Sequence, residues 1–101
     1  MYGSIRRYRI VSGNFDEIVN TVKEGLLPLL EKAPGFLGYY IVDTKDNKAT
    51  SFTICENQAG VDQANRVAMD WVKKNLSKQL TDPEVFAGNM PVAFMHQHQR
   101  V

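Results

Sequence analysis

The chain has 101 residues, 44% of them hydrophobic, and a formal net charge of +1 at pH 7. This length predicts a single domain spanning residues 1–101, with a modest core. The balanced charge excludes nucleic acid as the main partner, because phosphate binding needs a clustered positive field. Neither a signal peptide nor a membrane-spanning run is expected, and a lone cysteine, Cys55, favours the reducing cytoplasm.

The N-terminal third predicts a strand followed by a helix. Residues 4–11 alternate between two faces, and the alternation places Arg7 and Arg9 on one face and Arg6 on the other. Asn14 and Glu17 have the spacing of a capping box, so a helix is expected from about Phe15 to Glu31. Because Pro28 cannot donate a backbone hydrogen bond, it is expected to kink this helix.

The middle of the chain predicts a turn and a β-hairpin. Pro34 and Gly35 end the first helix, and the aromatic and β-branched residues 36–42 then favour a strand. The polar residues 44–48 connect this strand to a second one, predicted over residues 49–56.

The C-terminal half predicts a long helix and a last strand. Asn57 is the expected cap of the helix, which runs to about Leu80 by its apolar periodicity. The strand, over residues 85–95, is interrupted by Pro91, which indicates an edge position. His96 and His98 follow it, but two ligands do not make a metal site, so no metal is expected.

The predicted order of elements is strand, helix, strand, strand, helix, strand. Right-handed crossovers convert this order into an α+β, ferredoxin-like βαββαβ sandwich, a four-stranded antiparallel sheet with both helices on one face. The other face would leave tyrosine and phenylalanine side chains in water. A homodimer through this open sheet face is therefore expected.

Four stretches of the sequence resemble the antibiotic-biosynthesis-monooxygenase-like family of the dimeric α+β barrel superfamily. They are the opening strand GSIRRYR, the turn APGF with the glycine and tyrosines after it, the strand end TICE running into NQA, and the long helix that carries Trp71. The resemblance implies a dimeric α+β barrel with a pocket between sheet and helices. It also implies that members such as the quinone-forming monooxygenases oxidise an aromatic or polyketide-like molecule with no metal, flavin or other cofactor.

The resemblance implies that tyrosine, tryptophan, asparagine and arginine side chains bind and deprotonate a phenol. On this basis the catalytic candidates are Trp71, Tyr40 and Asn75, and the substrate-binding candidates are Tyr39, Arg7, Asn65 and Phe52. Trp71 and Asn75 lie one turn apart on the same helix, while Tyr39 and Tyr40 point to opposite faces of their strand.

Each candidate also has a structural interpretation. Trp71 can be a core aromatic, the tyrosines can be packed rings, and the arginines can pair with carboxylates such as Glu56. The haem-degrading branch fits poorly, because it needs a histidine on the second helix and an asparagine on the first strand, and this chain has neither. Two functions remain open: a cofactor-independent monooxygenase, and a non-catalytic homodimer that binds a small ligand or acts as an accessory protein.

Overall fold

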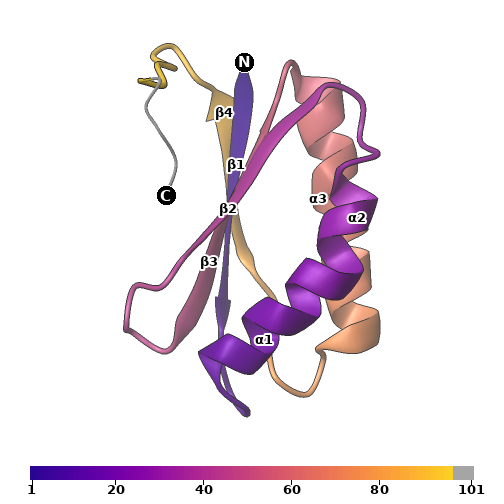
Figure 1. The fold of residues 1–101 in the computed structure, drawn as a ribbon, viewed down its shortest axis with the longest axis vertical. Helices are drawn as coiled ribbons and strands as arrows, with labels where there is room; N and C mark the ends of the chain where they lie inside the picture. Colours follow the sequence, from indigo (N-terminus) through magenta and orange to yellow (C-terminus); the bar gives the residue numbers. More distant parts are fainter. Residues whose placement is uncertain (97–101) are drawn as a thin grey trace.

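The computed structural model describes residues 1–96 as one antiparallel sheet covered on a single face by helices. Figure 1 shows both helical segments on the same side of the sheet, with no helix of the described residues on the other side. In this part of the chain the strands are β1 (Tyr2–Arg9), β2 (Phe36–Val42), β3 (Lys48–Cys55) and β4 (Glu84–Asn89). The strand order is β2-β3-β1-β4, which confirms the predicted ferredoxin-like sandwich.

Strand β1 lies in the middle of the sheet, between β3 and β4. Its residue Arg6 stands opposite Ser51 of β3 and Val85 of β4 in the two antiparallel registers. Strand β2 matches its predicted bounds and forms the outer edge beyond β3, with an irregularity between Phe36 and Gly38. The helix-facing side of β1 is thus enclosed by strands on both sides and by helices above.

The first helical segment consists of α1 (Phe15–Thr21), a π-helical turn η1 (Val22–Leu26) and α2 (Leu27–Leu30). The predicted capping box is present, since the Glu17 amide donates to Asn14 Oδ1 at 2.9 Å and Asn14 Nδ2 donates to Glu17 Oε1 at 2.7 Å. The predicted irregularity at Pro28 lies one turn earlier. Pro28 occupies the first turn of α2, and the helix widens upstream of it, where the Leu27 amide bonds to the carbonyl of Val22.

The second helix, α3 (Gln58–Asn75), begins at the predicted cap and ends before the predicted end. The Asn57 side chain accepts from the Gly60 amide at 3.1 Å. The helix ends at Asn75, with Leu76 as its cap, instead of at about Leu80, because the chain then turns to follow β1. The Val11 amide bonds to Gln79 O, and the Thr81 amide bonds to Arg9 O. Leu80 forms a β-bridge with Ile10. The last strand is also shorter than predicted, since β4 ends at Asn89, before Pro91.

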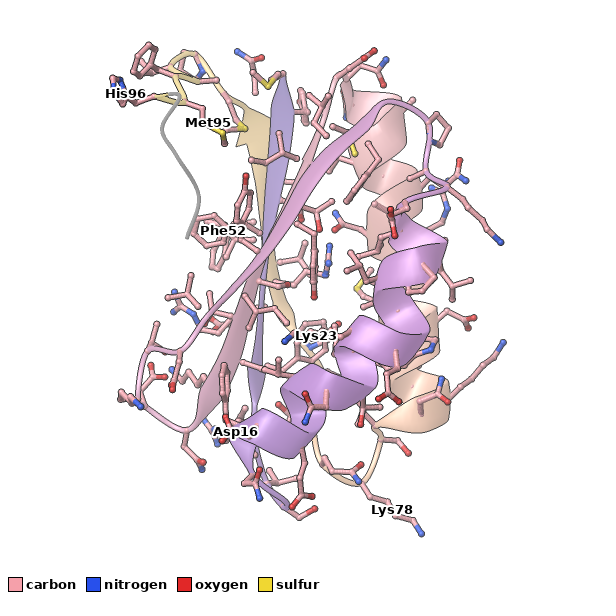
Figure 2. All side chains as sticks on the ribbon, in the orientation of Figure 1. Asp16, Lys23, Phe52, Lys78, Met95 and His96 are labelled. Atoms are coloured by element: carbon pink, nitrogen blue, oxygen red, sulfur yellow. The ribbon has the colours of Figure 1, made fainter. Side chains whose placement is uncertain are left out.

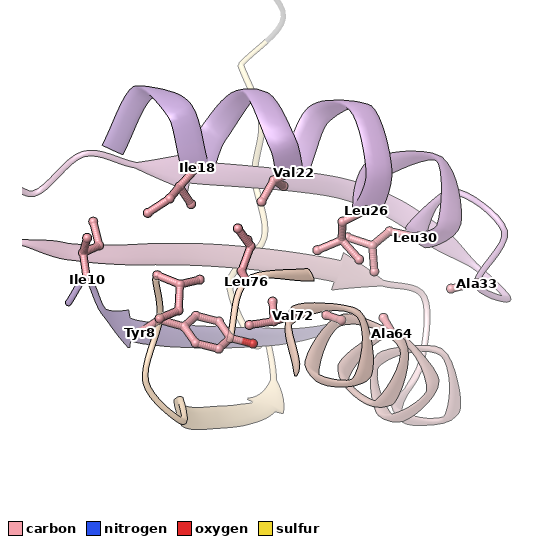
Figure 3. Close-up of a cluster of buried hydrophobic side chains, with 12 residues drawn as sticks. Tyr8, Ile10, Ile18, Val22, Leu26, Leu30, Ala33, Ala64, Val72 and Leu76 are labelled. Atoms are coloured by element: carbon pink, nitrogen blue, oxygen red, sulfur yellow. The ribbon is translucent and has the colours of Figure 1, made fainter. Parts of the chain in front are cut away.

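The hydrophobic core fills the space between the sheet and the two helical segments. Figure 3 shows Ile18, Val22, Leu26 and Leu30 of the first segment directed at the sheet and at α3. Tyr8 enters the same cluster from β1 and lies next to Val72 of α3. A tyrosine with its polar hydroxyl therefore belongs to an otherwise aliphatic core.

The open face of the sheet carries large apolar side chains. Phe52 points away from the helices, and Met95 lies on the same side of the sheet (Figure 2). Phe52 is 39% exposed and Phe86 54% exposed. Tyr40 and Val42 of β2 are exposed as well. This surface is what the sequence predicted for the uncovered face.

Candidate functional site

The least expected residue of the core is Arg6, on the helix-facing side of β1. Only 1% of its surface is exposed. Its Nη1 donates to Asn65 Oδ1 at 2.6 Å and its Nη2 donates to Thr53 Oγ1 at 3.0 Å. Asn65 Oδ1 also accepts from Ser4 Oγ at 2.8 Å, so three elements, β1, β3 and α3, hold the guanidinium in place.

The partners that hold Arg6 are all neutral. In residues 1–96 the carboxylates that form ion pairs are Asp43 with Lys45 and Asp70 with Lys74, both on the surface. A buried guanidinium has lost its hydration, and without an opposite charge this loss costs several kcal/mol. Arg6 is therefore an uncompensated positive charge fixed inside the core.

Two tyrosines lie beside this charge, Tyr8 on β1 and Tyr39 on β2. Burial raises the pKa of the Tyr8 hydroxyl above its ordinary value of 10.0, and the charge of Arg6 acts against this shift. Burial likewise raises the pKa of Tyr39, again opposed by Arg6. Both hydroxyls consequently stay protonated at neutral pH and can donate hydrogen bonds to an anion.

A cavity of about 30 Å³ lies between the sheet and the helices, where Arg6, Tyr8 and Tyr39 contribute to its wall. This volume has room for about two water molecules. Val22, Leu26, Ala68 and Val72 supply much of the apolar remainder. Among the described residues, two buried side-chain hydroxyls have no hydrogen-bond partner, those of Tyr8 and Thr50. Tyr8 lines this cavity, whereas the side chain of Thr50 shares the other face of the sheet with Arg7.

Two of the predicted site residues belong to this cluster. Tyr39 lines the cavity, and Asn65 contacts Arg6 directly. The sequence analysis did not select Arg6, although alternation had already placed it on the same face as Tyr8 and Ile10. The available signal was a charged residue in an otherwise apolar face. It was overlooked because nothing local to β1 indicates which face the helices cover.

Trp71 and Asn75 lie elsewhere on α3. The Trp71 indole packs against the π-helical turn, where a Cβ added at Gly25 would come within 2.5 Å of Cζ2 of the ring. The Asn75 side chain is exposed and donates to the carbonyl of Trp71 at 2.9 Å. Neither residue lines the cavity beside Arg6. Trp71 thus stabilises the contact between α3 and the first helical segment.

The remaining predicted residues, Tyr40, Phe52 and Arg7, lie on the open face of the sheet. Tyr40 stands opposite Phe52 in the register of β2 and β3, and Arg7 stands opposite Thr50. The structure therefore divides the predicted set between two sides of the sheet. A site that contains all seven residues within one protomer is not formed.

Comparison with known proteins identifies the fold. No family model matches the chain, and the search of curated proteins finds no match. Among solved structures, a protein of unknown function from Nitrosomonas europaea, NE2512, has a TM-score of 0.77 at 14% identity, covering 96% of this chain and 95% of that chain. The monooxygenase ActVA-Orf6 of Streptomyces coelicolor, solved with nanaomycin D, has a TM-score of 0.71 at 14% identity, with 95% and 92% coverage.

A third similar structure is a dimeric ferredoxin-like protein from an uncultured marine organism, with a TM-score of 0.71 at 13% identity, covering 95% of this chain and 100% of that chain. These likenesses confirm the ferredoxin-like fold. At such low identity they establish the fold and leave the reaction open.

Two searches of the described residues bear on metals and membranes. In residues 1–96, no three His, Cys, Asp or Glu side chains come together as a group able to hold a metal ion. The second histidine of the predicted pair, His98, lies outside the described residues. Of the helices in this part of the chain, none combines the length and apolar composition that a membrane span requires.

Proposed function

We propose that this protein binds a small phenolate or enolate beside Arg6 and that the bound anion reduces dioxygen without a metal or flavin. The observation that carries the proposal is the buried guanidinium of Arg6, which is 1% exposed and has only neutral partners. An anion bound at Arg6 would compensate this charge in a low-dielectric environment, where the attraction is strong. The fold neighbours that are monooxygenases support this reaction class.

The chemistry requires little of the protein beyond stabilising the anion. A phenol related to 1-naphthol binds as its phenolate, and its proton stays in the solvent. The phenolate gives one electron to dioxygen, and the two radicals combine at the ring carbon opposite the oxygen. The peroxide takes up a proton, then loses hydroxide together with the proton of that carbon, which breaks the O–O bond. One dioxygen thus yields one quinone and one water.

Oxygen uptake with 1-naphthol tests this function. We expect one dioxygen consumed per naphthoquinone formed, and a loss of at least about 100-fold in rate on Arg6→Met, since one electrostatic stabiliser contributes on that order. Arg9→Met, at the exposed end of the same strand, is the matched control and should keep the rate within about twofold. Uptake no faster than in buffer, or an unchanged rate in Arg6→Met, would reject the oxygenase.

A second candidate function is a non-catalytic protein that binds a small anion. One observation favours it, since the cavity of about 30 Å³ is too small to enclose an aromatic ring as it stands. Native mass spectrometry of freshly purified protein, combined with the oxygen-uptake assay, distinguishes the two candidate functions. A bound anionic molecule that causes no oxygen consumption supports the binding protein.

We also propose that the functional unit is a homodimer joined through the open sheet face. The exposed side chains of Tyr40, Phe52 and Phe86 support this assembly, because an apolar patch of this kind is usually covered by a partner. One fold neighbour is described as dimeric.

Replacing Phe52 with lysine is expected to convert the dimer into a monomer. The lysine would bury a charge in the interface, at a cost of several kcal/mol. Light scattering after size-exclusion chromatography measures the mass. Leu29→Lys is the matched control, because Leu29 of α2 is also 39% exposed but lies on the helical layer. A monomeric parent protein, or a Phe52→Lys dimer as stable as the parent, would refute this interface.

A further inference from the structure

The cavity beside Arg6 lies next to a second hollow, which opens at the surface. A groove of about 290 Å³ runs along the surface between the first helical segment and β2. Val19, Val22, Tyr39 and Ile41 line both the groove and the buried cavity. A single layer of side chains therefore separates the charged interior from this groove.

The shared wall is the least buried side of the cavity. Val19, Tyr39 and Ile41 are only half-buried, whereas Tyr8, Val72 and Leu80, which separate the cavity from a second surface pocket near α3, are 5–6% exposed. That second pocket also has charged residues on its rim, among them Arg66 and Asp70. The groove beside β2 thus offers the thinner and more apolar route to Arg6.

The helix on the groove side is irregular at the same place. Val22 begins the π-helical turn, in which the Leu27 amide bonds to the carbonyl five residues earlier. Such turns are rare interruptions of α-helices and are frequently found at functional sites. Gly25 in this turn gives Trp71 room to pack against the backbone, so the turn is braced from α3.

The charges around the groove suit an anion that enters head first. Lys23 lies on the rim, and the carboxylate of Asp43 is paired with Lys45 at 3.0 Å. Inside, Arg6 has no carboxylate partner among residues 1–96. The buried positive charge of Arg6 lies at the inner end of this path, and the apolar side chains that line the groove lie between Arg6 and the surface.

We propose that the groove between the π-helical turn and β2 is the binding site for the flat apolar body of an aromatic anion whose charged head reaches Arg6. This inference rests on the proposed function, because it uses the same Arg6 site. It adds the class of ligand, a molecule with one anionic head and an apolar aromatic body. The head fits the volume of about 30 Å³ beside Arg6, and the body displaces the half-buried wall.

Titration with three probes, followed by NMR chemical shifts, tests the inference. The probes are 2-naphthoate, acetate as a head without a body, and 2-naphthalenemethanol as a body without a charge. We expect 2-naphthoate to bind at least about tenfold more tightly than either of the others, since it alone uses both halves of the site.

Leu27→Phe is the discriminating variant, because Leu27 is half-buried and lines the groove but not the cavity beside Arg6. It should weaken 2-naphthoate at least about tenfold and leave acetate within about twofold. Asn20→Phe is the matched control, since Asn20 is exposed and lines neither the groove nor the cavity, and it should bind both anions like the parent. If Leu27→Phe does not fold, magnetisation transfer from naphthalene protons to the Val19 and Ile41 methyl groups of the parent protein tests the same placement.

The outcomes separate this inference from the proposed function. The groove is overturned, while the Arg6 site stands, if acetate binding is lost in Arg6→Met but 2-naphthoate binds no more tightly than acetate and is unaffected by Leu27→Phe. Tight binding of 2-naphthalenemethanol overturns the anionic head. Binding of neither anion overturns both proposals. Binding of 2-naphthoate as expected without oxygen uptake on 1-naphthol supports the groove and rejects the oxygenase.

Discussion

Replacing Asn65 with leucine is expected to lower the free energy of unfolding by about 3 kcal/mol. Leucine has the same number of side-chain heavy atoms as asparagine and the same branching at Cγ, so the change removes the acceptor without leaving a large cavity. Oδ1 of Asn65 accepts from both Arg6 and Ser4, which are 1% and 2% exposed. The variant would leave two buried donors without their acceptor, one of them charged.

Replacing Arg6 itself should cost far less. In Arg6→Met the buried charge disappears, and Asn65 Oδ1 keeps the hydroxyl of Ser4 as a donor at 2.8 Å. Substituting a buried charge with an apolar side chain of similar length is often neutral or stabilising. We therefore expect a change within about 1 kcal/mol, and a double variant that is more stable than Asn65→Leu alone.

Urea denaturation followed by the fluorescence of Trp71, the only tryptophan, measures all three variants. One fixed protein concentration is needed, because dimerisation would make apparent stability depend on concentration. Additive effects in the double variant would contradict the account, since they would mean that Arg6 does not depend on Asn65. A large loss in Arg6→Met would show that the guanidinium is needed for stability instead of ligand binding.

The fold could be predicted largely because its signals are local. The aromatic and β-branched residues 36–42 gave β2 its bounds, and Asn14 and Asn57 marked the starts of α1 and α3. The end of α3 was missed because it depends on Ile10 and Arg9, which contact residues 80 and 81 from the far end of the chain. No helical pattern can contain information of that kind.

The site was predictable only in part, for a related reason. Tyr39 and Asn65 were selected from their residue types, and the structure brings them to the same charged cluster. Arg6 was overlooked because its burial depends on α3 and on the first helical segment covering one face of β1. The π-helical turn depends on an equally distant contact, between Gly25 and Trp71. Burial of a charge and irregularity of a helix are properties of the assembled layers.

Replacing Gly60 with alanine is expected to lower the free energy of unfolding by about 2 kcal/mol, although alanine is the better helix former. Gly60 is buried in the first turn of α3, where a Cβ would collide with the carbonyl oxygen of Pro34 and would lie 3.0 Å from Cβ of Cys55. The neighbour that would have to move is backbone, and overpacking of this kind costs up to about 3 kcal/mol. The gain in helix propensity offsets about 1 kcal/mol of that cost.

The backbone that Gly60 meets cannot easily yield. Gly35 adopts a left-handed φ of 66°, the Phe36 amide bonds to Ala33 O at 3.2 Å, and the Glu56 amide bonds to Gly35 O at 2.9 Å. Gly88→Ala is the matched control, since a Cβ there would meet nothing within 4 Å, and its stability should stay within about 0.5 kcal/mol of the parent. Thermal unfolding of the two variants measures the difference. A Gly60→Ala protein as stable as Gly88→Ala would mean that α3 can move away from the turn, and the close packing of α3 against residues 33–36 would then not be needed to position Asn65 over Arg6.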